Sequence, residues 1–218
     1  MDVITLATGS TGNCYFVKDV NGKTIILDCG ISFQEITHHQ DFPKFSDIEF
    51  VFVSHIHWLH KDHSKSMKDF YRSGCEMLTY EMLEPKLQNM EFPHFRVKLF
   101  AVKHNCLNFG IIIQSKETGE KLCYMTDFFQ APMVEGIDTF IFEVNYIDSL
   151  IDEMIDEDKD LKHLGFNNHC SLEYAIEYFS TMKTRPKKIY CCHGSKSHSI
   201  KKRIYEGIKQ FADEVVVL

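Results

Sequence analysis

The sequence lacks any apolar run long enough to cross a lipid bilayer. Its uninterrupted apolar runs extend over only a few residues, such as Ile111–Ile113 and Val215–Leu218. A membrane-spanning helix needs about 20 apolar residues. We therefore exclude an integral membrane protein and expect no membrane partner.

The first residues also lack the basic segment and the long apolar stretch of a secretory signal peptide. None of the eight cysteines forms a Cys-x-x-Cys pair, so neither a zinc-finger pattern nor a redox motif is present. Without an export signal, we expect these cysteines to be reduced thiols and the chain to be cytoplasmic.

Linkers, internal repeats and low-complexity tracts are absent as well, which favours a single domain over residues 1–218. A hydrophobic content of 44% and a charged content of 25% are typical of globular proteins. A chain of this length buries roughly 70–75% of its unfolded surface, so a core can form without disulfides or structural metal.

Basic residues are outnumbered, 24 against 31 acidic residues, which gives a net charge of −7. This balance disfavours a large non-specific footprint on duplex DNA, which needs many cations to neutralise phosphates. The segment Tyr178–Tyr205 nevertheless contains eight bases and no acid. Either this segment is a solvated surface, or it attracts an anionic substrate.

The alternation of apolar residues and the turn signals predict many strands and a few helices. The predicted strands are Asp2–Leu6, Cys14–Lys18, Lys23–Asp28, Glu49–Ser54, Arg96–Lys103, Phe109–Ser115, Lys121–Thr126, Thr139–Val144, Lys188–Cys192 and Glu214–Leu218. The predicted helices are Ser32–His39, Asp62–Arg72, Ser171–Met182 and Lys201–Ala212, the first opened by the capping-box spacing of Ser32 and Glu35. Strands that meander early, with helices interspersed later, favour stacked sheets covered by helices.

The histidines are concentrated directly after the predicted strand that ends near Val53. The segment SHIHWLHKDH holds His55, His57, His60 and His63, with Asp62 beside the last of them. Imidazole nitrogens and carboxylate oxygens are ligands of Zn²⁺, and a loop at a strand end can direct several of them at one point. This segment therefore indicates a metal site.

Three further residues of ligand type also stand at predicted strand ends. His104 follows Lys103, Asp127 ends the motif YMTD, and His193 follows the motif IYCC. Any one of them could be an ordinary hydrogen-bonding residue, but three such positions beside the histidine cluster favour one shared centre.

These motifs together resemble the metallo-β-lactamase-fold hydrolases, whose signature is HxHxDH after a strand, followed by a strand-end His, Asp and His. The opening LATGSTGNCYF resembles that of a single-domain, exonuclease-like branch, and IILDCG resembles the family's strand-end Asp-x-Gly. NNHCSLEYA followed by IYCCHGS resembles the late motifs of tRNase Z-like phosphodiesterases. The resemblance implies an α/β fold, the four-layer αββα sandwich of that family.

The first motif is longer here than in the family, since His55 to His63 spans nine residues instead of six. A three-residue expansion restores the pattern with either His57 or His60 as the second ligand. Alignment without an insertion would place Leu59 where the family has its aspartate, and we disfavour it. The choice between His57 and His60 stays open.

The resemblance implies a two-metal centre, with two Zn²⁺ ions per chain or Mn²⁺ in their place. One ion would take His55, His57 or His60, and His104, and the other would take Asp62, His63 and His193, with Asp127 bridging both. Asp28 would orient a ligand imidazole. Asp62 and His169 are the residues to which we assign catalytic roles, Asp62 as a metal ligand and His169 as a general acid.

The function predicted on this basis is hydrolysis by a metal-activated hydroxide. A phosphodiester, in a nucleotide or a single-stranded nucleic acid, is the leading substrate because of the basic segment around His193. A lactone, thioester or carboxylic ester on the same centre is the second hypothesis. A metal-binding chain whose expanded loop has impaired catalysis is the third. The oligomeric state stays open, a homodimer included.

Overall fold

The computed structural model describes residues 1–9, 11–55, 61–79, 89–150, 168–194 and 198–218, and of residues 61–63 it describes the backbone alone. These residues form two compact units. Unit 1 comprises Met1–Phe100 and Phe109–Lys121, and unit 2 comprises Ala101–Asn108 and Leu122–Leu218.

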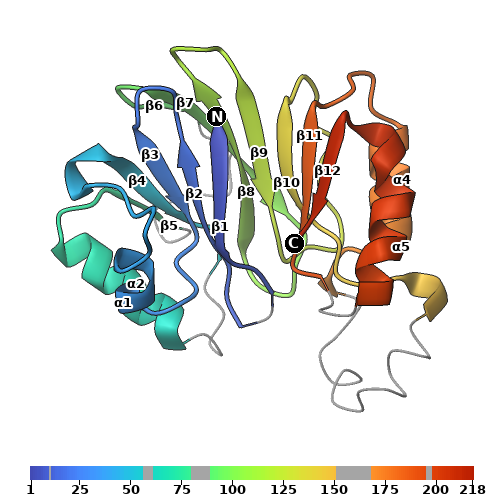
Figure 1. Cartoon of the computed structure of the whole chain (residues 1–218), viewed down its shortest axis with the longest axis horizontal. Helices are drawn as coiled ribbons and strands as arrows, with labels where there is room; N and C mark the ends of the chain where they lie inside the picture. Colours follow the sequence, from blue (N-terminus) through green and yellow to red (C-terminus); the bar gives the residue numbers. More distant parts are fainter. Residues whose placement is uncertain (10, 56–60, 80–88, 151–167, 195–197) are drawn as a thin grey trace. The chain divides into compact units, whose positions relative to one another are not determined.

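Unit 1 contains a five-stranded sheet in which the strands are ordered as they occur in the sequence (Figure 1). Its strands are β1 (Asp2–Ala7), β2 (Cys14–Lys18), β3 (Thr24–Leu27), β4 (Ile48–Val53) and β5 (Met77–Thr79). The first three form an antiparallel meander, whereas β3, β4 and β5 pair in parallel. Because parallel strands end at the same edge, the residues after β3 and β4 are brought to one side of the sheet.

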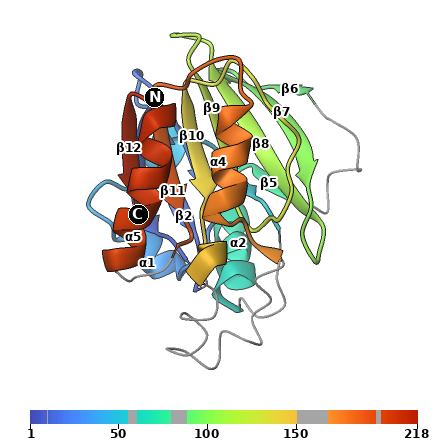
Figure 2. The same ribbon diagram turned by 90° about the vertical axis from the view of Figure 1, so that its right-hand side faces the viewer.

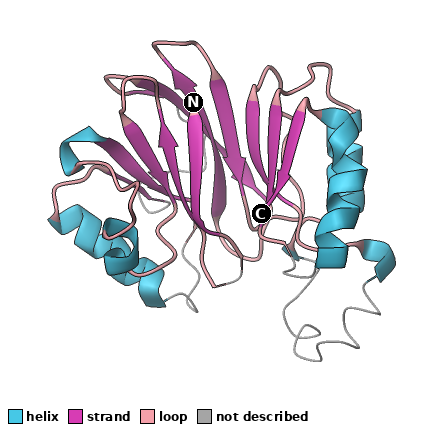
Figure 3. Cartoon of the chain, in the orientation of Figure 1, coloured by secondary structure: helices cyan, strands magenta, loops and turns pink. Residues whose placement is uncertain are grey.

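Two helices, α1 (Phe33–Thr37) and α2 (Lys61–Arg72), lie against this sheet (Figure 3). Ile36 of α1 and Phe70 of α2 belong to one buried apolar cluster with Phe16, Ile26 and Val51 of the strands. The predicted capping box at the start of α1 is present, with the Ser32 and Glu35 side chains each accepting from the other's backbone N–H. The packing of both helices fixes the strand ends that precede them.

The remaining strands that begin or end in unit 1 are β6 (Asn89–Glu91), β7 (Phe95–Val102) and β8 (Asn108–Ser115), and β6 pairs antiparallel with β7. A short 3₁₀ turn, η1 (Phe45–Asp47), leads into β4. Aromatic rings fill this part of the core, including Phe50 against Phe92 with ring centroids 4.5 Å apart.

Unit 2 contains parallel strands in the order β12, β11, β10, β9 (Figure 1). Their bounds are β9 (Lys121–Met125), β10 (Thr139–Glu143), β11 (Lys188–Cys192) and β12 (Glu214–Val217). The helices α4 (Leu172–Ser180) and α5 (His198–Ile208) lie on one face of these strands (Figure 2). Two 3₁₀ turns, η3 (Asp148–Leu150) and η6 (Lys209–Phe211), complete the described elements of unit 2.

Every predicted strand and helix is present, with ends that differ by a few residues at most. The largest difference is α5, which begins at His198 instead of Lys201 and gives way to η6 after Ile208. The strands β5 and β6 were not predicted, because each has only three residues and too few alternating positions to produce a pattern. Most of the acidic stretch after Asp148 lies outside the described residues.

All eight cysteines remain thiols, and all but the half-exposed Cys106 are buried. Among the described residues, no helix has the length and apolar character that a membrane crossing requires.

Candidate metal centre

Three of the residues selected from sequence have a backbone conformation that L-amino acids avoid. Asp28, Asp127 and His193 have φ values of 55°, 53° and 59°, in the left-handed region. This conformation costs a non-glycine residue about 1–2 kcal/mol. Such strain persists only where the surroundings enforce it, and it is concentrated at functional sites. Each of these residues lies just beyond the end of a parallel strand.

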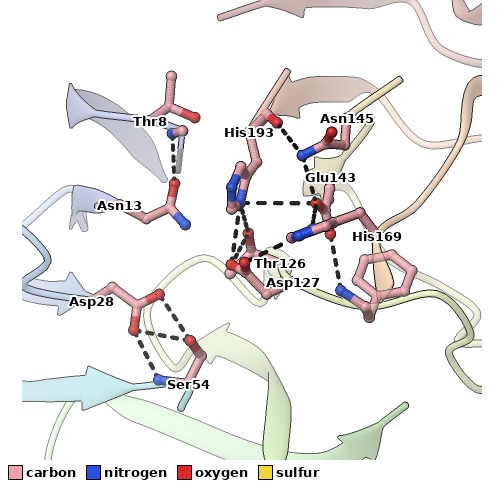
Figure 4. A network of polar contacts seen from close by, with 12 residues as sticks. Thr8, Asn13, Asp28, Ser54, Thr126, Asp127, Glu143, Asn145, His169 and His193 are labelled. Carbon is pink, nitrogen blue, oxygen red and sulfur yellow. Dashed lines mark hydrogen bonds and ion pairs between the residues drawn. The ribbon is translucent and has the colours of Figure 1, made fainter. Parts of the chain in front are cut away.

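The register of the parallel strands explains why the unit 2 candidates converge. Glu143, the last residue of β10, pairs with Cys192, the last residue of β11, and Phe142 pairs with Met125 at the end of β9. The residues that follow these positions therefore meet at one edge. We call Asp127, Glu143, His169 and His193 the strand-edge cluster (Figure 4).

The Asp127 carboxylate and the His193 imidazole form the centre of this cluster. Asp127 Oδ2 lies 3.1 Å from His193 Nδ1, and the Thr126 hydroxyl donates to Asp127 Oδ2 at 3.0 Å. Asp127 is 6% exposed and His193 5% exposed. A carboxylate this deeply buried requires partners, because an isolated buried charge is costly.

A second pair, Glu143 and His169, lies beside the first. Glu143 is fully buried at the end of β10, and its Oε1 lies 2.7 Å from His169 Nδ1. Its other oxygen, Oε2, accepts from the backbone N–H of Phe128 at 2.9 Å. The carboxylate is thus fixed at both oxygens, and it holds the imidazole in one orientation.

Glu143 was missed in the sequence, although a signal was present. It is the only acid in the apolar run TFIFEV, and it ends a strand, as the selected residues do. An ionisable residue in such a run has to be paired when the strand is buried on both faces.

The ionisation of His169 reflects these neighbours. Burial by itself lowers the pKa of His169, but the charge and hydrogen bond of Glu143, together with the charge of Asp127, raise that pKa above its ordinary value. The Asp127 carboxylate lies 3.9 Å from His169 Nδ1. The two carboxylates therefore favour a cation at this position.

His104 belongs to the same neighbourhood of unit 2. Its Nδ1 lies 3.0 Å from the backbone carbonyl oxygen of Asn168, and its ring centroid is 5.7 Å from that of His169. A ligand atom of His104 also lies within 4.8 Å of one of Asp127. Unit 2 thus brings together three residues predicted as metal ligands, His104, Asp127 and His193, with the predicted acid His169 beside them.

The donor set of the cluster fits a metal ion. Asp127, His169 and His193 each offer one ligand atom, and these three atoms lie within 4.8 Å of one another. Two imidazoles and a carboxylate are a set that Zn²⁺ accepts. His169 is therefore placed where either a ligand or a proton donor could act, whereas sequence reasoning gave it the second role alone.

A further residue missed in the sequence, Asn108, holds the strained backbone of Asp127. Its buried amide Nδ2 donates to the carbonyl oxygens of Thr126 and Asp127 at 2.8 and 2.5 Å. No sequence signal marks it, because a single asparagine at the start of a strand has no distinctive spacing.

In unit 1, Asp28 acts on His55 through a serine. The Asp28 carboxylate accepts from the Ser54 backbone N–H at 2.8 Å and from the Ser54 hydroxyl at 2.9 Å (Figure 4). The Ser54 Oγ lies 3.0 Å from His55 Nδ1. All three residues are buried. The predicted orienting role of Asp28 therefore has a hydrogen-bonded route, with Ser54 as an unpredicted intermediate.

The glycine-rich opening loop packs against the turn that contains Asp28. A Cβ on Gly12 would lie 2.2 Å from the Gly30 carbonyl oxygen, so the two backbones touch only because Gly12 has no side chain. The Gly30 N–H donates to the Asn13 carbonyl oxygen at 2.9 Å. Two motifs that are separate in the sequence, LATGSTGN and DCG, thereby form one packed turn.

The expanded first motif is described only in part. His57 and His60 lie outside the described residues, and Asp62 and His63 stand in the first turn of α2 with side chains outside that description. The choice between His57 and His60 and the ligand roles of Asp62 and His63 stay predictions.

Comparison with solved structures identifies the fold. The chain is similar over 99% of its length to the metallo-β-lactamase fold protein YhfI from Bacillus subtilis, with a TM-score of 0.70, 13% identity and 95% of that chain covered. It is similar over its full length to human short-form tRNase Z, with a TM-score of 0.63, 18% identity and 96% of that chain covered. Unliganded yeast PDE1 matches 99% of the chain with a TM-score of 0.62 and 10% identity, and 96% of PDE1 is covered.

No protein-family model matches the chain, and no curated protein sequence is significantly similar to it. The similarity therefore resides in the fold. The chain has the metallo-β-lactamase fold, and the predicted fold class, an α/β structure of the αββα type, is confirmed.

Proposed function

We propose that this chain is a metal-dependent hydrolase that cleaves phosphodiesters in a nucleotide or a single-stranded nucleic acid. The observation that carries the proposal is the strand-edge cluster, in which the buried Asp127 carboxylate converges with the imidazoles of His169 and His193. Glu143 fixes the His169 ring. The backbone strain at Asp127 and His193 supports a functional origin for this convergence, because packing alone gives no reason for it.

Asp127 and His193, with His104 close to Asp127, would hold the metal in unit 2. The ion would supply Lewis-acid polarisation of the scissile group and activation of water near neutral pH. The full two-ion set implied by the family resemblance also includes His55, His57 or His60, Asp62 and His63, and it stays part of the proposal. Zinc is the ion that this set of imidazoles and carboxylates favours, with Mn²⁺ as the alternative.

His169 is the residue that we propose as proton donor to the leaving oxygen. Its Nδ1 faces Glu143 Oε1 at 2.7 Å, which fixes the ring and leaves the proton-transfer role to Nε2. A positioned acid of this kind accelerates cleavage by roughly 10²–10⁴-fold.

The phosphodiester preference is supported by the basic segment that contains His193. That segment, Tyr178–Tyr205, carries eight bases and no acid in a chain of net charge −7. Arg185, Lys187 and Lys188 form ion pairs with acids from outside the segment. The bases of α5, Lys201, Lys202 and Arg203, would therefore supply the positive charge that raises the local concentration of an anionic substrate.

The single-domain organisation, the cytoplasmic location and the oligomeric state stay predictions.

Metal analysis combined with two substrates tests the proposal. We expect about two ions per purified chain and hydrolysis of bis(p-nitrophenyl) phosphate that is faster than the opening of an N-acyl lactone. Faster lactone opening would replace the phosphodiester proposal with the carbonyl-ester hypothesis. One ion or none, with no turnover of either substrate, would support the catalytically impaired alternative.

A further inference from the structure

The segment that follows Asp127 combines a fixed backbone with exposed apolar side chains. Phe128 is fully buried, with its ring against those of Phe142 and Tyr174. The next residue, Phe129, is 38% exposed, and Met133 in the same segment is 43% exposed. An exposed apolar side chain is ordinary by itself, so the case for a binding surface depends on how the segment is held and on what lies near it.

The backbone of Phe129 is held next to two residues of the candidate metal centre. Its N–H donates to the Lys103 carbonyl oxygen at 2.9 Å, and the Lys103 N–H donates to the Gln130 carbonyl oxygen at 2.8 Å. Lys103 directly precedes His104, and Phe129 stands two residues after Asp127. The backbone of Phe129 is thus hydrogen-bonded to the residue before His104, two positions after Asp127, and both His104 and Asp127 are predicted metal ligands.

Two tyrosines of α4 secure the rest of the segment. The Tyr174 hydroxyl accepts from the Ala131 N–H at 3.0 Å, and the Tyr178 hydroxyl accepts from the Val134 N–H at 3.2 Å. Tyr178 also donates to the Pro132 carbonyl oxygen at 3.1 Å. Because these hydrogen bonds hold the segment before a ligand binds, binding does not carry the entropic cost of ordering it.

A lysine ammonium group belongs to the same bridge. The Lys103 side chain is exposed, and its Nζ donates to Gln130 Oε1 at 2.7 Å, which holds the ammonium group on the bridge that carries Phe129. An aromatic face for a base and a cation for the backbone phosphate are the two elements with which proteins hold single-stranded nucleic acid. An acyl chain would use the apolar surface but would gain nothing from the cation.

We propose that Phe129 is a stacking platform for a nucleobase next to the scissile phosphate, with Lys103 contacting a neighbouring phosphate. This inference rests on the proposed function and assigns recognition of the substrate's base to Phe129. Phe129 would act in binding and specificity and would not take part in bond cleavage.

The test compares intact single-stranded oligonucleotides with oligonucleotides of the same length whose bases are replaced by abasic tetrahydrofuran residues. Both kcat/KM and binding by fluorescence anisotropy are measured on the metal-loaded full chain. We expect the wild type to prefer the intact oligonucleotide, and Phe129→Ala and Phe129→Leu to weaken its binding by roughly 5- to 100-fold while leaving the abasic one unchanged. Phe129→Trp should keep the preference, because it keeps an aromatic face.

Phe45→Ala is the matched control, since Phe45 is a phenylalanine of η1 with 42% exposure and lies outside the basic segment. An unchanged base preference in both Phe129→Ala and Phe129→Leu would overturn the proposal. The proposal would also be overturned if Phe129→Ala lost lactone turnover while Phe129→Leu kept it. That result would indicate that Phe129 contacts the acyl chain of a substrate and not a base. If the wild type cleaves no phosphodiester, the proposed function fails, and anisotropy on the same chain still shows whether Phe129 stacks on bases.

Discussion

At the scale of single residues, the candidate chemistry depends on hydrogen bonds that hold imidazoles in one orientation. Glu143 holds His169 in unit 2, and Ser54 links Asp28 to His55 in unit 1. In each case the bond is made by Nδ1, which fixes the tautomer and the ring plane. Residues that never touch a substrate can thus decide how well a histidine works.

The Glu143–His169 pair gives the first prediction. Glu143→Gln keeps the shape of the side chain and an oxygen that can accept from His169 Nδ1, but it removes the charge, so His169 loses its electrostatic support. We expect kcat to fall by roughly 10²–10⁴-fold in His169→Ala, by a similar factor in Glu143→Gln, and by little more in the double variant. Zinc content should stay at the wild-type level in all three, measured by elemental analysis. Loss of zinc from His169→Ala would show that His169 is a ligand and not the acid.

The second prediction concerns Ser54. Ser54→Ala removes the hydroxyl between Asp28 and His55 but leaves the backbone bond from the Ser54 N–H to Asp28 in place. We expect zinc affinity to fall by about 10–100-fold, as is typical when a partner of a ligand histidine is lost. Ser54→Thr retains the hydroxyl and should restore most of the affinity. Competition with a chromogenic chelator measures both, and equal affinities of Ser54→Ala and the wild type would contradict the route from Asp28 to His55.

At the scale of elements, strand ends explain the site. Parallel strands in register deliver their last residues to one edge, so residues as distant in the sequence as Asp127 and His193 meet without any loop reaching across. This edge is also where ligands bind in parallel α/β sheets. The same rule applies within unit 1 to Asp28 and Ser54.

Much of this arrangement could be predicted from the sequence, because buried parallel strands appear as short apolar runs and the polar residue that ends each run is conspicuous. This rule identified Asp127 and His193 in unit 2. The same signal was overlooked at Glu143, which also ends an apolar run. The rule does not apply to Asn108, whose role depends on contacts to residues that follow another strand. Contacts of this kind join residues with no pattern in common, so one sequence does not reveal them.

The turn formed by the opening loop gives the third prediction. Gly12→Ala would bring a Cβ to 2.2 Å from the Gly30 carbonyl oxygen, so the opening loop has to move away from the turn that contains Asp28. Gly22→Ala is the control, because Gly22 has a positive φ of 78° but no atom lies within 4 Å of the place that a Cβ would take there. We expect Gly22→Ala to cost about 1 kcal/mol of unfolding free energy, through backbone strain alone.

Gly12→Ala should lower the free energy of unfolding by a further 1–3 kcal/mol or so, because overpacking adds to the strain. Urea denaturation of both variants measures the difference. Equal destabilisation by the two substitutions would contradict the close contact between Gly12 and Gly30.

At the scale of the whole molecule, the chain carries a net charge of −7, and it also buries two carboxylates, those of Asp127 and Glu143, in one cluster. The repulsion between these negative charges destabilises the native state. Their histidine partners offset part of this cost, and a divalent cation would offset more of it. Metal binding should therefore stabilise the native state as well as support catalysis. Only the folded chain brings these ligands together, so the metal binds the native state in preference to the unfolded one.

Removal of the metal is the fourth prediction. A ligand that is present at 100 times its dissociation constant and binds only the native state adds about 2.7 kcal/mol of stability. In a chain of this size, each kcal/mol shifts Tm by roughly 2–4 °C, so treatment with EDTA should lower Tm by about 5–10 °C, and added Zn²⁺ should restore it. Asp127→Asn is the control, because loss of the charged ligand should make Tm insensitive to both reagents. A wild-type Tm that EDTA does not change would mean that no metal is bound by the native chain, and the proposed hydrolytic centre would then have no support in solution.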